Sequence, residues 1–171
     1  RKYWLGLIVL FFASQLHGTA QAWLAFELTN SPLKLTLVMA MQSVPMFLLS
    51  MYSGVIIDRI QKRNVIVVTQ IITAIVAGAI TVLIATNNIQ YWHLLVSSFI
   101  GGLNGAFNMT ARNSIIVELV PRERLYNAIA LNNVGANGAS IIGPAIAGIL
   151  IGSMGMQGAY YFAVGFYIIG I

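Results

Sequence analysis

The chain has 171 residues, of which 58% are hydrophobic and 8% carry a charge. A soluble domain carries about 25% charged residues, so this composition excludes an ordinary water-soluble enzyme. Nine Lys and Arg against four Asp and Glu give a net charge of +5, and the sequence has no cysteine for a disulfide, a thiolate nucleophile or a metal ligand. We therefore expect an all-helical membrane protein with no metal and no cofactor.

Six apolar stretches follow one another along the chain, separated by short segments that concentrate charge and turn residues. They run from about 4 to 28, 35 to 57, 64 to 86, 92 to 111, 127 to 151 and 158 to 171. A helix needs about 20 apolar residues to cross a bilayer, so the first five are long enough to span it. The sixth is shorter, and the sequence begins with Arg1 instead of Met. We expect residues 1–171 to be a fragment that ends inside a sixth transmembrane helix.

The basic residues fall almost entirely on one side of this map. Eight of the nine precede the first helix or lie in the second or fourth connection: Arg1, Lys2, Arg59, Lys62, Arg63, Arg112, Arg122 and Arg124. Lys34 alone falls on the other side. Because basic loops remain in the cytoplasm, this pattern predicts a cytoplasmic N-terminus. We expect no nucleic-acid partner, since the basic residues form no continuous stripe with interleaved aromatics.

Polar residues recur on one face of several apolar stretches at intervals of three or four residues. They are Ser14, His17 and Gln21 in the first stretch, Gln42 in the second, Asn104, Asn108 and Arg112 along the fourth, and Asn133 and Asn137 in the fifth. Polar side chains are costly in lipid, so these faces predict that the first, second, fourth and fifth helices line a central cavity. The third and sixth helices are expected to lie outside it.

A simpler explanation exists for each of these residues taken singly. Interhelical hydrogen bonds hold membrane helices together, and a lone buried residue such as His17 is more often a packing residue than a proton carrier. Three helices that each show one coherent polar face favour the cavity over this alternative.

The connection between the second and third stretches holds one of the four acidic residues. Asp58 follows the C-terminal end of a helix, where its charge is unfavourable for the helix dipole, so it is expected to seek a cation or a helix N-terminus elsewhere. This makes the turn a candidate gating latch. The alternative is a solvated loop whose basic residues only fix the topology.

This turn resembles the signature G-x-x-x-D-R-x-x-[RK]-[RK] of the major facilitator superfamily. The matching residues are Gly54, Asp58, Arg59, Lys62 and Arg63. Further along, the element around Gly143, Pro144 and Gly148 is similar to the bacterial exporter branch that includes enterobactin and macrolide exporters. The resemblance covers the whole chain. It implies the N-terminal six-helix half of a twelve-helix fold in a bacterial inner membrane, with the C-terminal half of the polypeptide absent and the substrate site between the halves.

The resemblance also implies roles for these residues. Asp58 and Arg59 would stabilise the outward-facing state, and the Gly-Pro element would mark a drug:proton antiporter. Pro144 removes a backbone hydrogen bond, and the glycines beside it permit close packing where a helix must rock. Two positions depart from the pattern, because Ser140 and Ser98 stand where many members of the branch or of the antiporters carry arginine.

The leading functional hypothesis is a secondary transporter that exports a small organic molecule, a drug-like compound or a siderophore, by alternating access and proton antiport. Glu27, His17 or a carboxylate in the absent half would carry the coupling proton. An uptake permease of the same fold is the nearest alternative. A membrane-embedded enzyme or a non-transporting receptor is less favoured, because the sequence offers no converging nucleophile, base or metal cluster.

Overall fold

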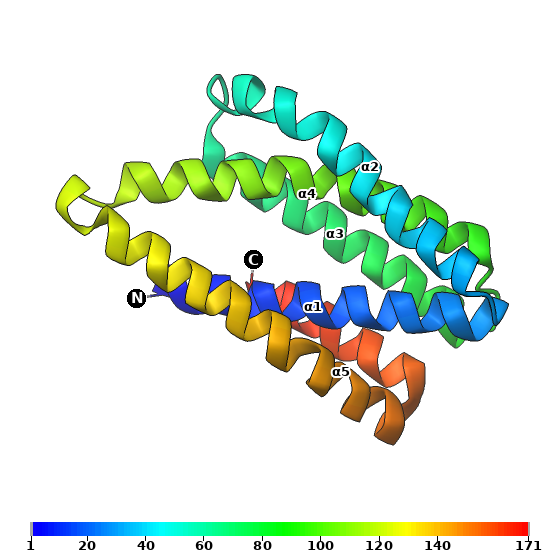
Figure 1. The fold of residues 1–171 in the computed structure, drawn as a ribbon. Helices are drawn as coiled ribbons and strands as arrows, with labels where there is room; N and C mark the ends of the chain where they lie inside the picture. Colours follow the sequence, from blue (N-terminus) through cyan, green and yellow to red (C-terminus); the bar gives the residue numbers. More distant parts are fainter. Residues whose placement is uncertain (1, 171) are drawn as a thin grey trace.

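The computed structural model describes the backbone of residues 2–170; the side chains of 1–5, 7, 8, 118, 119, 122 and 169–171 lie outside the description. The described chain is helical throughout (Figure 1). Its elements are α1 (Lys2–Thr29), α2 (Pro32–Ile57), α3 (Lys62–Ala85), α4 (Tyr91–Leu119), the short 3-10 helix η1 (Arg122–Arg124) and α5 (Leu125–Gly170).

The last element is two helical segments in one. Gly155 interrupts α5 with φ 72° and ψ −178°, a conformation open essentially only to glycine. The chain reverses direction there, and the segment after Gly155 runs back alongside α1 (Figure 1). The described residues thus hold five α-helices, of which the last consists of two segments, and the break falls between the fifth and sixth apolar stretches.

Three helices among the described residues are long and apolar enough to cross a membrane, namely Pro32–Ile57, Lys62–Ala85 and Leu125–Ile168. The helices α1 and α4 have similar lengths, 28 and 29 residues. Both carry polar residues along their length, which lowers their mean hydropathy. Those polar residues line the pocket described below.

The connections sort onto two ends of the bundle. The N-terminus, the turn between α2 and α3, and the turn before α5 lie toward the left in Figure 1, whereas the other connections and the reversal within α5 lie toward the right. Arg59 and Arg63 are therefore at the same end as Arg124. This is the arrangement that the alternation of basic residues predicts.

A buried apolar cluster holds the right-hand end together. It contains Leu24 of α1, Val38 of α2, Ile84 of α3, Leu94 of α4 and Tyr160 of α5. Every helix contributes to it, so this end is closed by side-chain packing. Smaller clusters continue the contact between α1 and the segment after Gly155 toward the other end.

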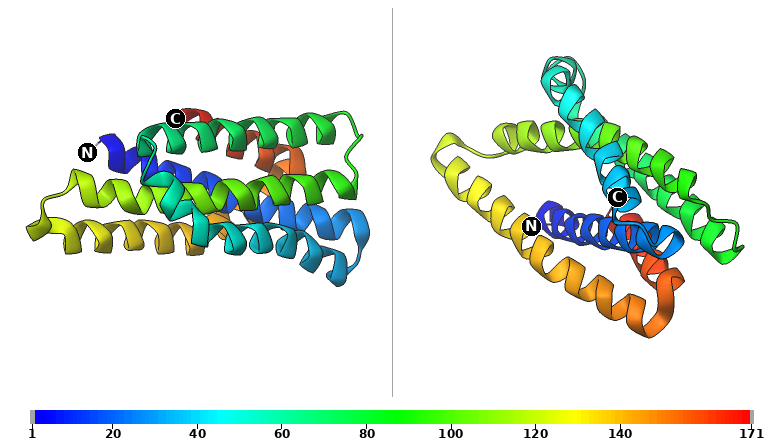
Figure 2. Two further views of the ribbon diagram at one scale, coloured as in Figure 1. Left: turned by 90° about the horizontal axis from the view of Figure 1, so that it is seen from above. Right: turned by 45° about the vertical axis from the view of Figure 1, so that its right-hand side comes forward.

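Two glycines set how closely helices approach. The α2 helix packs mainly on α4 (Figure 2), and a Cβ on Gly102 would collide with the backbone carbonyl oxygen of Gln42. A Cβ on Gly143 would collide with the side chain of Gln15, where α5 packs on α1. At both places the absence of a side chain permits the observed packing.

Candidate functional site

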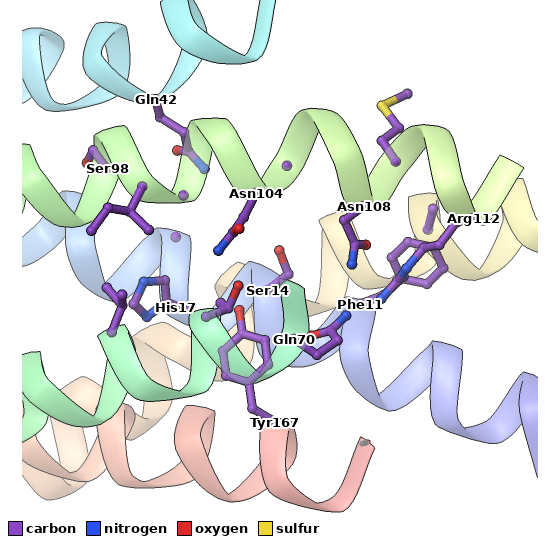
Figure 3. A pocket seen from close by; sticks show the side chains of 18 of the residues that line it. Phe11, Ser14, His17, Gln42, Gln70, Ser98, Asn104, Asn108, Arg112 and Tyr167 are labelled. Carbon is purple, nitrogen blue, oxygen red and sulfur yellow. The ribbon is translucent and has the colours of Figure 1, made fainter. Parts of the chain in front are cut away.

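A polar pocket lies in the middle of the bundle. Its volume is about 460 Å³, and every helix contributes to its wall (Figure 3). Its lining is rich in amides and hydroxyls: Ser14, His17, Gln21, Gln42, Gln70, Thr73, Ser97, Ser98, Asn104, Asn108, Arg112, Asn113, Asn132, Asn133 and Tyr167, with Phe11 and small or apolar residues between them. A volume of this size matches the small-molecule sites of proteins.

The structure brings together eight of the nine residues that the polar stripes single out. They are Ser14, His17, Gln21, Gln42, Asn104, Asn108, Arg112 and Asn133. The ninth, Asn137, lies outside the pocket on the exposed surface of α5. Four residues carry a helix through about 400°, so Asn137 is rotated about 40° from Asn133. This rotation turns the Asn137 side chain away from the pocket. The predicted polar stripe on α5 therefore includes one residue, Asn137, that does not line the pocket.

The expectation that the third and sixth helices lie outside the cavity is wrong. Gln70, Thr73 and Val76 of α3 and Tyr167 of α5 line the pocket. Gln70 is also buried, at 6% exposure. The sequence carries a signal for α3, because Gln70 and Thr73 are three residues apart within an apolar run. For the segment after Gly155 the only signal is the Tyr167 hydroxyl.

Some of the polar lining residues hold helices to one another. Gln21 Nε2 donates hydrogen bonds to the Leu94 carbonyl oxygen at 3.1 Å and to Ser98 Oγ at 2.8 Å, which join α1 to α4. Asn108 Nδ2 donates to Thr69 Oγ1 at 2.7 Å, which joins α4 to α3. For Gln21 and Asn108 the interhelical explanation therefore holds alongside their position in the pocket wall.

Other polar atoms in the wall have no hydrogen-bond partner among the described residues. They include His17 Nδ1, Ser97 Oγ, Asn104 Nδ2 and Asn132 Oδ1. The His17 ring packs edge-on against Tyr160 and Tyr167, at centroid distances of 5.5 and 6.2 Å. Buried polar groups in proteins are satisfied in the great majority of cases, so these atoms have the capacity to bind a polar solute or water.

Arg112 is the one permanently charged side chain among the described residues of the lining. It is 8% exposed, and its guanidinium carbon lies 5.1 Å from the centroid of the Phe11 ring. That distance is within the range of a cation–π interaction. Figure 3 shows Arg112 and Phe11 together at one end of the pocket, with Asn108 beside them.

The candidate gating turn is compact and charged. Asp58 caps the C-terminus of α2, where its backbone N–H donates to the Gly54 carbonyl oxygen at 3.0 Å. The side chains of Asp58, Arg59 and Arg63 are exposed, and Lys62 begins α3. A Cβ on Gly54 would meet nothing within 4 Å, so this glycine makes no close helix contact within the described chain.

The Gly-Pro element divides between two surfaces. Gly143 faces α1, whereas Pro144 and Gly148 lie on the exposed side of α5. The helix continues through Pro144, and the sharp break in α5 comes eleven residues later at Gly155.

The two candidate coupling residues lie in different places. His17 lines the central pocket, whereas Glu27 lines a second hollow of about 370 Å³ near Gly155, which also contains Asn87 and Gln157. The described residues hold no group of three or more His, Cys, Asp or Glu that could bind a metal.

Comparison with known proteins gives concordant matches. An uncharacterized MFS-type transporter of Bacillus subtilis, YfiS, is 27% identical over 94% of this chain and 39% of its own length. Macrolide efflux protein A of Streptococcus pyogenes is 23% identical over 86% of the chain and 36% of its own length. The multidrug efflux pump Tap of Mycolicibacterium fortuitum is 24% identical over 87% and 39%. The chain thus spans about two-fifths of the length of these relatives.

The helical bundle, the charged turn between α2 and α3 and these relatives agree with the major facilitator superfamily. A family profile described as transmembrane secretion effector matches residues 1–171. The chain belongs to that family.

Proposed function

We propose that the full-length protein is a secondary transporter that exports a small organic molecule, a drug-like compound or a siderophore, across a bacterial inner membrane. The observation that carries the proposal is the central pocket, a solute-sized polar volume walled by all the helices in a chain from a transporter family. The efflux names of the streptococcal and mycobacterial relatives support export over uptake.

In this proposal the chain is the N-terminal six-helix domain, with its N-terminus in the cytoplasm. The basic turns that share one end of the bundle support that orientation, because basic loops are retained on the cytoplasmic side (Figure 1). The pocket would face the matching surface of a second six-helix half. Alternating access would then expose the bound solute to each side in turn.

The proposed energy source is the proton gradient. A coupling group must be titratable and must contact each side in turn, and His17 in the pocket wall is the candidate within this half. Glu27 lies in the second hollow, at the opposite end from Asp58, and would carry a proton near the outer surface. A carboxylate in the second half is the alternative carrier.

The test is a flux assay with the full-length protein in inverted membrane vesicles and a labelled macrolide as the first solute. We expect accumulation in the vesicles that depends on an imposed pH gradient and stops when an uncoupler is added. Accumulation without a pH gradient would contradict proton coupling. Movement of the solute in the opposite direction would favour an uptake permease. A chemically altered product would favour an enzyme.

A further inference from the structure

We propose that the central pocket selects solutes that carry several hydroxyl groups on one ring, as a glycoside does, and that its amide side chains bind those hydroxyls. This inference rests on the proposed transport function and specifies its substrate class. It starts from six lining amides that form no side-chain hydrogen bond with another described residue. They are Gln42 of α2, Gln70 of α3, Asn104 and Asn113 of α4, and Asn132 and Asn133 of α5.

Two unpartnered polar side chains of the wall are almost fully buried. Gln70 is 6% exposed, and Ser97 is 5% exposed with no hydrogen-bond partner for its Oγ among the described residues. Both line the pocket. Buried polar groups are satisfied in the great majority of cases, and an unsatisfied one is costly inside a membrane bundle. These side chains are therefore available to a polar solute in the pocket.

The chemistry of an amide decides which polar solute fits. Each amide carries an N–H donor beside a carbonyl acceptor, and each hydroxyl both donates and accepts. One amide can therefore bind two neighbouring hydroxyls at once, donating to the first and accepting from the second. A carboxylate would use only the donors of such a wall, and an ammonium group only its acceptors. Several amides around one pocket thus match a ring with neighbouring hydroxyls.

The amides surround the pocket instead of forming a single stripe. Figure 3 shows Gln42, Gln70 and Asn104 entering it from α2, α3 and α4. Ser97 lies seven residues before Asn104, which places the two side chains on the same face of α4 two turns apart. A solute ring in the pocket would meet hydrogen-bonding groups on several of its edges.

The aromatic part of the wall suits the rest of such a solute. The rings of His17 and Tyr167 contact each other edge to face, with centroids 6.2 Å apart, and both line the pocket with Phe11. Aromatic faces pack against the C–H surface of a saturated ring and against an attached apolar group. The volume of about 460 Å³ lies within the range of small-molecule sites. The pocket therefore fits a sugar ring that carries an apolar substituent.

The experiment measures binding to the purified full-length protein by equilibrium dialysis, after subtraction of binding to empty detergent micelles. The probes are methylumbelliferyl glucoside and methylumbelliferyl tetrahydropyranyl ether, which has the same coumarin and a similar ring without hydroxyls. We expect the glucoside to bind at least about tenfold more tightly, because each hydrogen bond to an amide adds to its affinity. Equal binding, or tighter binding of the ether, overturns the inference and assigns the amides to bound water.

Gln70→Leu tests the buried amide of α3. Leucine has a similar size and suits a membrane helix, so the substitution removes the hydrogen-bonding group and keeps the packing. Glucoside binding should weaken by about 3- to 10-fold, the usual effect of losing a neutral hydrogen bond, and ether binding should stay within about twofold. Unchanged glucoside binding in this variant contradicts the inference.

A matched pair on α5 decides the question even if Gln70→Leu does not fold. Asn133 and Asn137 are both exposed and lie four residues apart, but only Asn133 lines the pocket. Asn133→Leu should weaken glucoside binding, whereas Asn137→Leu should leave both affinities unchanged. An equal effect of the two substitutions overturns the inference.

Failure of this inference and failure of the proposed function give different results. Gradient-driven flux of the ether at the same rate as the glucoside leaves the transport function standing and removes the hydroxyl preference. Binding of the glucoside that depends on Gln70 and Asn133, without flux of any solute, supports the hydroxyl site and removes the transport function.

Discussion

The Gln21 side chain joins the first and fourth helices through a hydrogen bond of 2.8 Å from its Nε2 to Ser98 Oγ. One turn beyond this bond, Leu24 and Leu94 belong to the buried cluster that all the helices share. The pocket is therefore closed at this end by an amide bridge and then by apolar packing. The family resemblance suggests that Ser98 stands near the position where many proton antiporters carry an arginine, and in this structure Ser98 makes a neutral contact.

Gln21→Leu should lower the stability of the protein. The substitution removes both hydrogen bonds to α4 and leaves Ser98 Oγ without its donor, and such an interhelical contact contributes about 0.6 to 2 kcal/mol in membranes. Thermal unfolding in detergent measures the effect. The matched control is Gln157→Leu at an exposed site near Gly155, and an equal loss in both variants would contradict the assignment.

Gly102→Ala should separate α2 from α4. The new Cβ would collide with the Gln42 carbonyl, which belongs to the backbone and has no rotamer to adopt, so the helices must move apart at a cost of about 1 to 3 kcal/mol. Unfolding of the full-length protein gives the value. In Gly78→Ala the added methyl meets nothing within 4 Å, so that variant should keep or gain stability. A neutral Gly102→Ala would show that the two helices are less closely packed.

Asp58→Asn should abolish or sharply reduce transport while the protein still inserts in the membrane. The carboxylate is exposed at the C-terminal end of α2, where it is available to a cation or a helix N-terminus in the second half. Flux in vesicles, normalised to the amount of inserted protein, measures the effect. Glu123→Gln, an exposed carboxylate at the same end, is the control. Wild-type flux in Asp58→Asn would remove the latch role.

Cysteine accessibility should distinguish the pocket from the lipid-facing surface. The 171 residues contain no cysteine, so Asn108→Cys and Asn133→Cys introduce single thiols into this half. Both side chains line the pocket, and both thiols should react with a water-soluble maleimide. Ile75→Cys, at a position of α3 that is 65% exposed, should stay unreactive in the bilayer. If both pocket thiols are inert in either gating state, the amides serve only to hold helices together.

The helical segments and most of the pocket wall could be predicted from the sequence, because apolar stretches and polar stripes are local properties. The end of α4 shows where this breaks down. The apolar run stops near 111, yet the helix continues to Leu119, because Arg112 and Asn113 face the pocket and their polarity does not end the helix. The end of an apolar run therefore marks the end of a helix only where the side chains of that helix face lipid.

The positions that sequence reasoning missed depend on how the helices are rotated and placed. Asn137 belongs to the stripe of Asn133, but the pocket wall takes only one side of that stripe. The Gln70 side chain looks like a minor polar residue in an apolar helix until α3 is packed beside α4. Intervals of three or four residues define a face, and only the packing of neighbouring helices decides what that face meets.

The reversal at Gly155 has a consequence for biogenesis. A single residue turns the chain between the two segments of α5, and the connection before α2 is similarly short, with only Asn30 and Ser31 outside the helices. Few polar groups therefore have to cross the hydrocarbon core when α1 and α2, or the two segments of α5, enter the bilayer as a pair. The insertion machinery would receive closely spaced helical hairpins, and lengthening the Gly155 reversal with a hydrophilic insert would slow this step before it disturbed the finished fold.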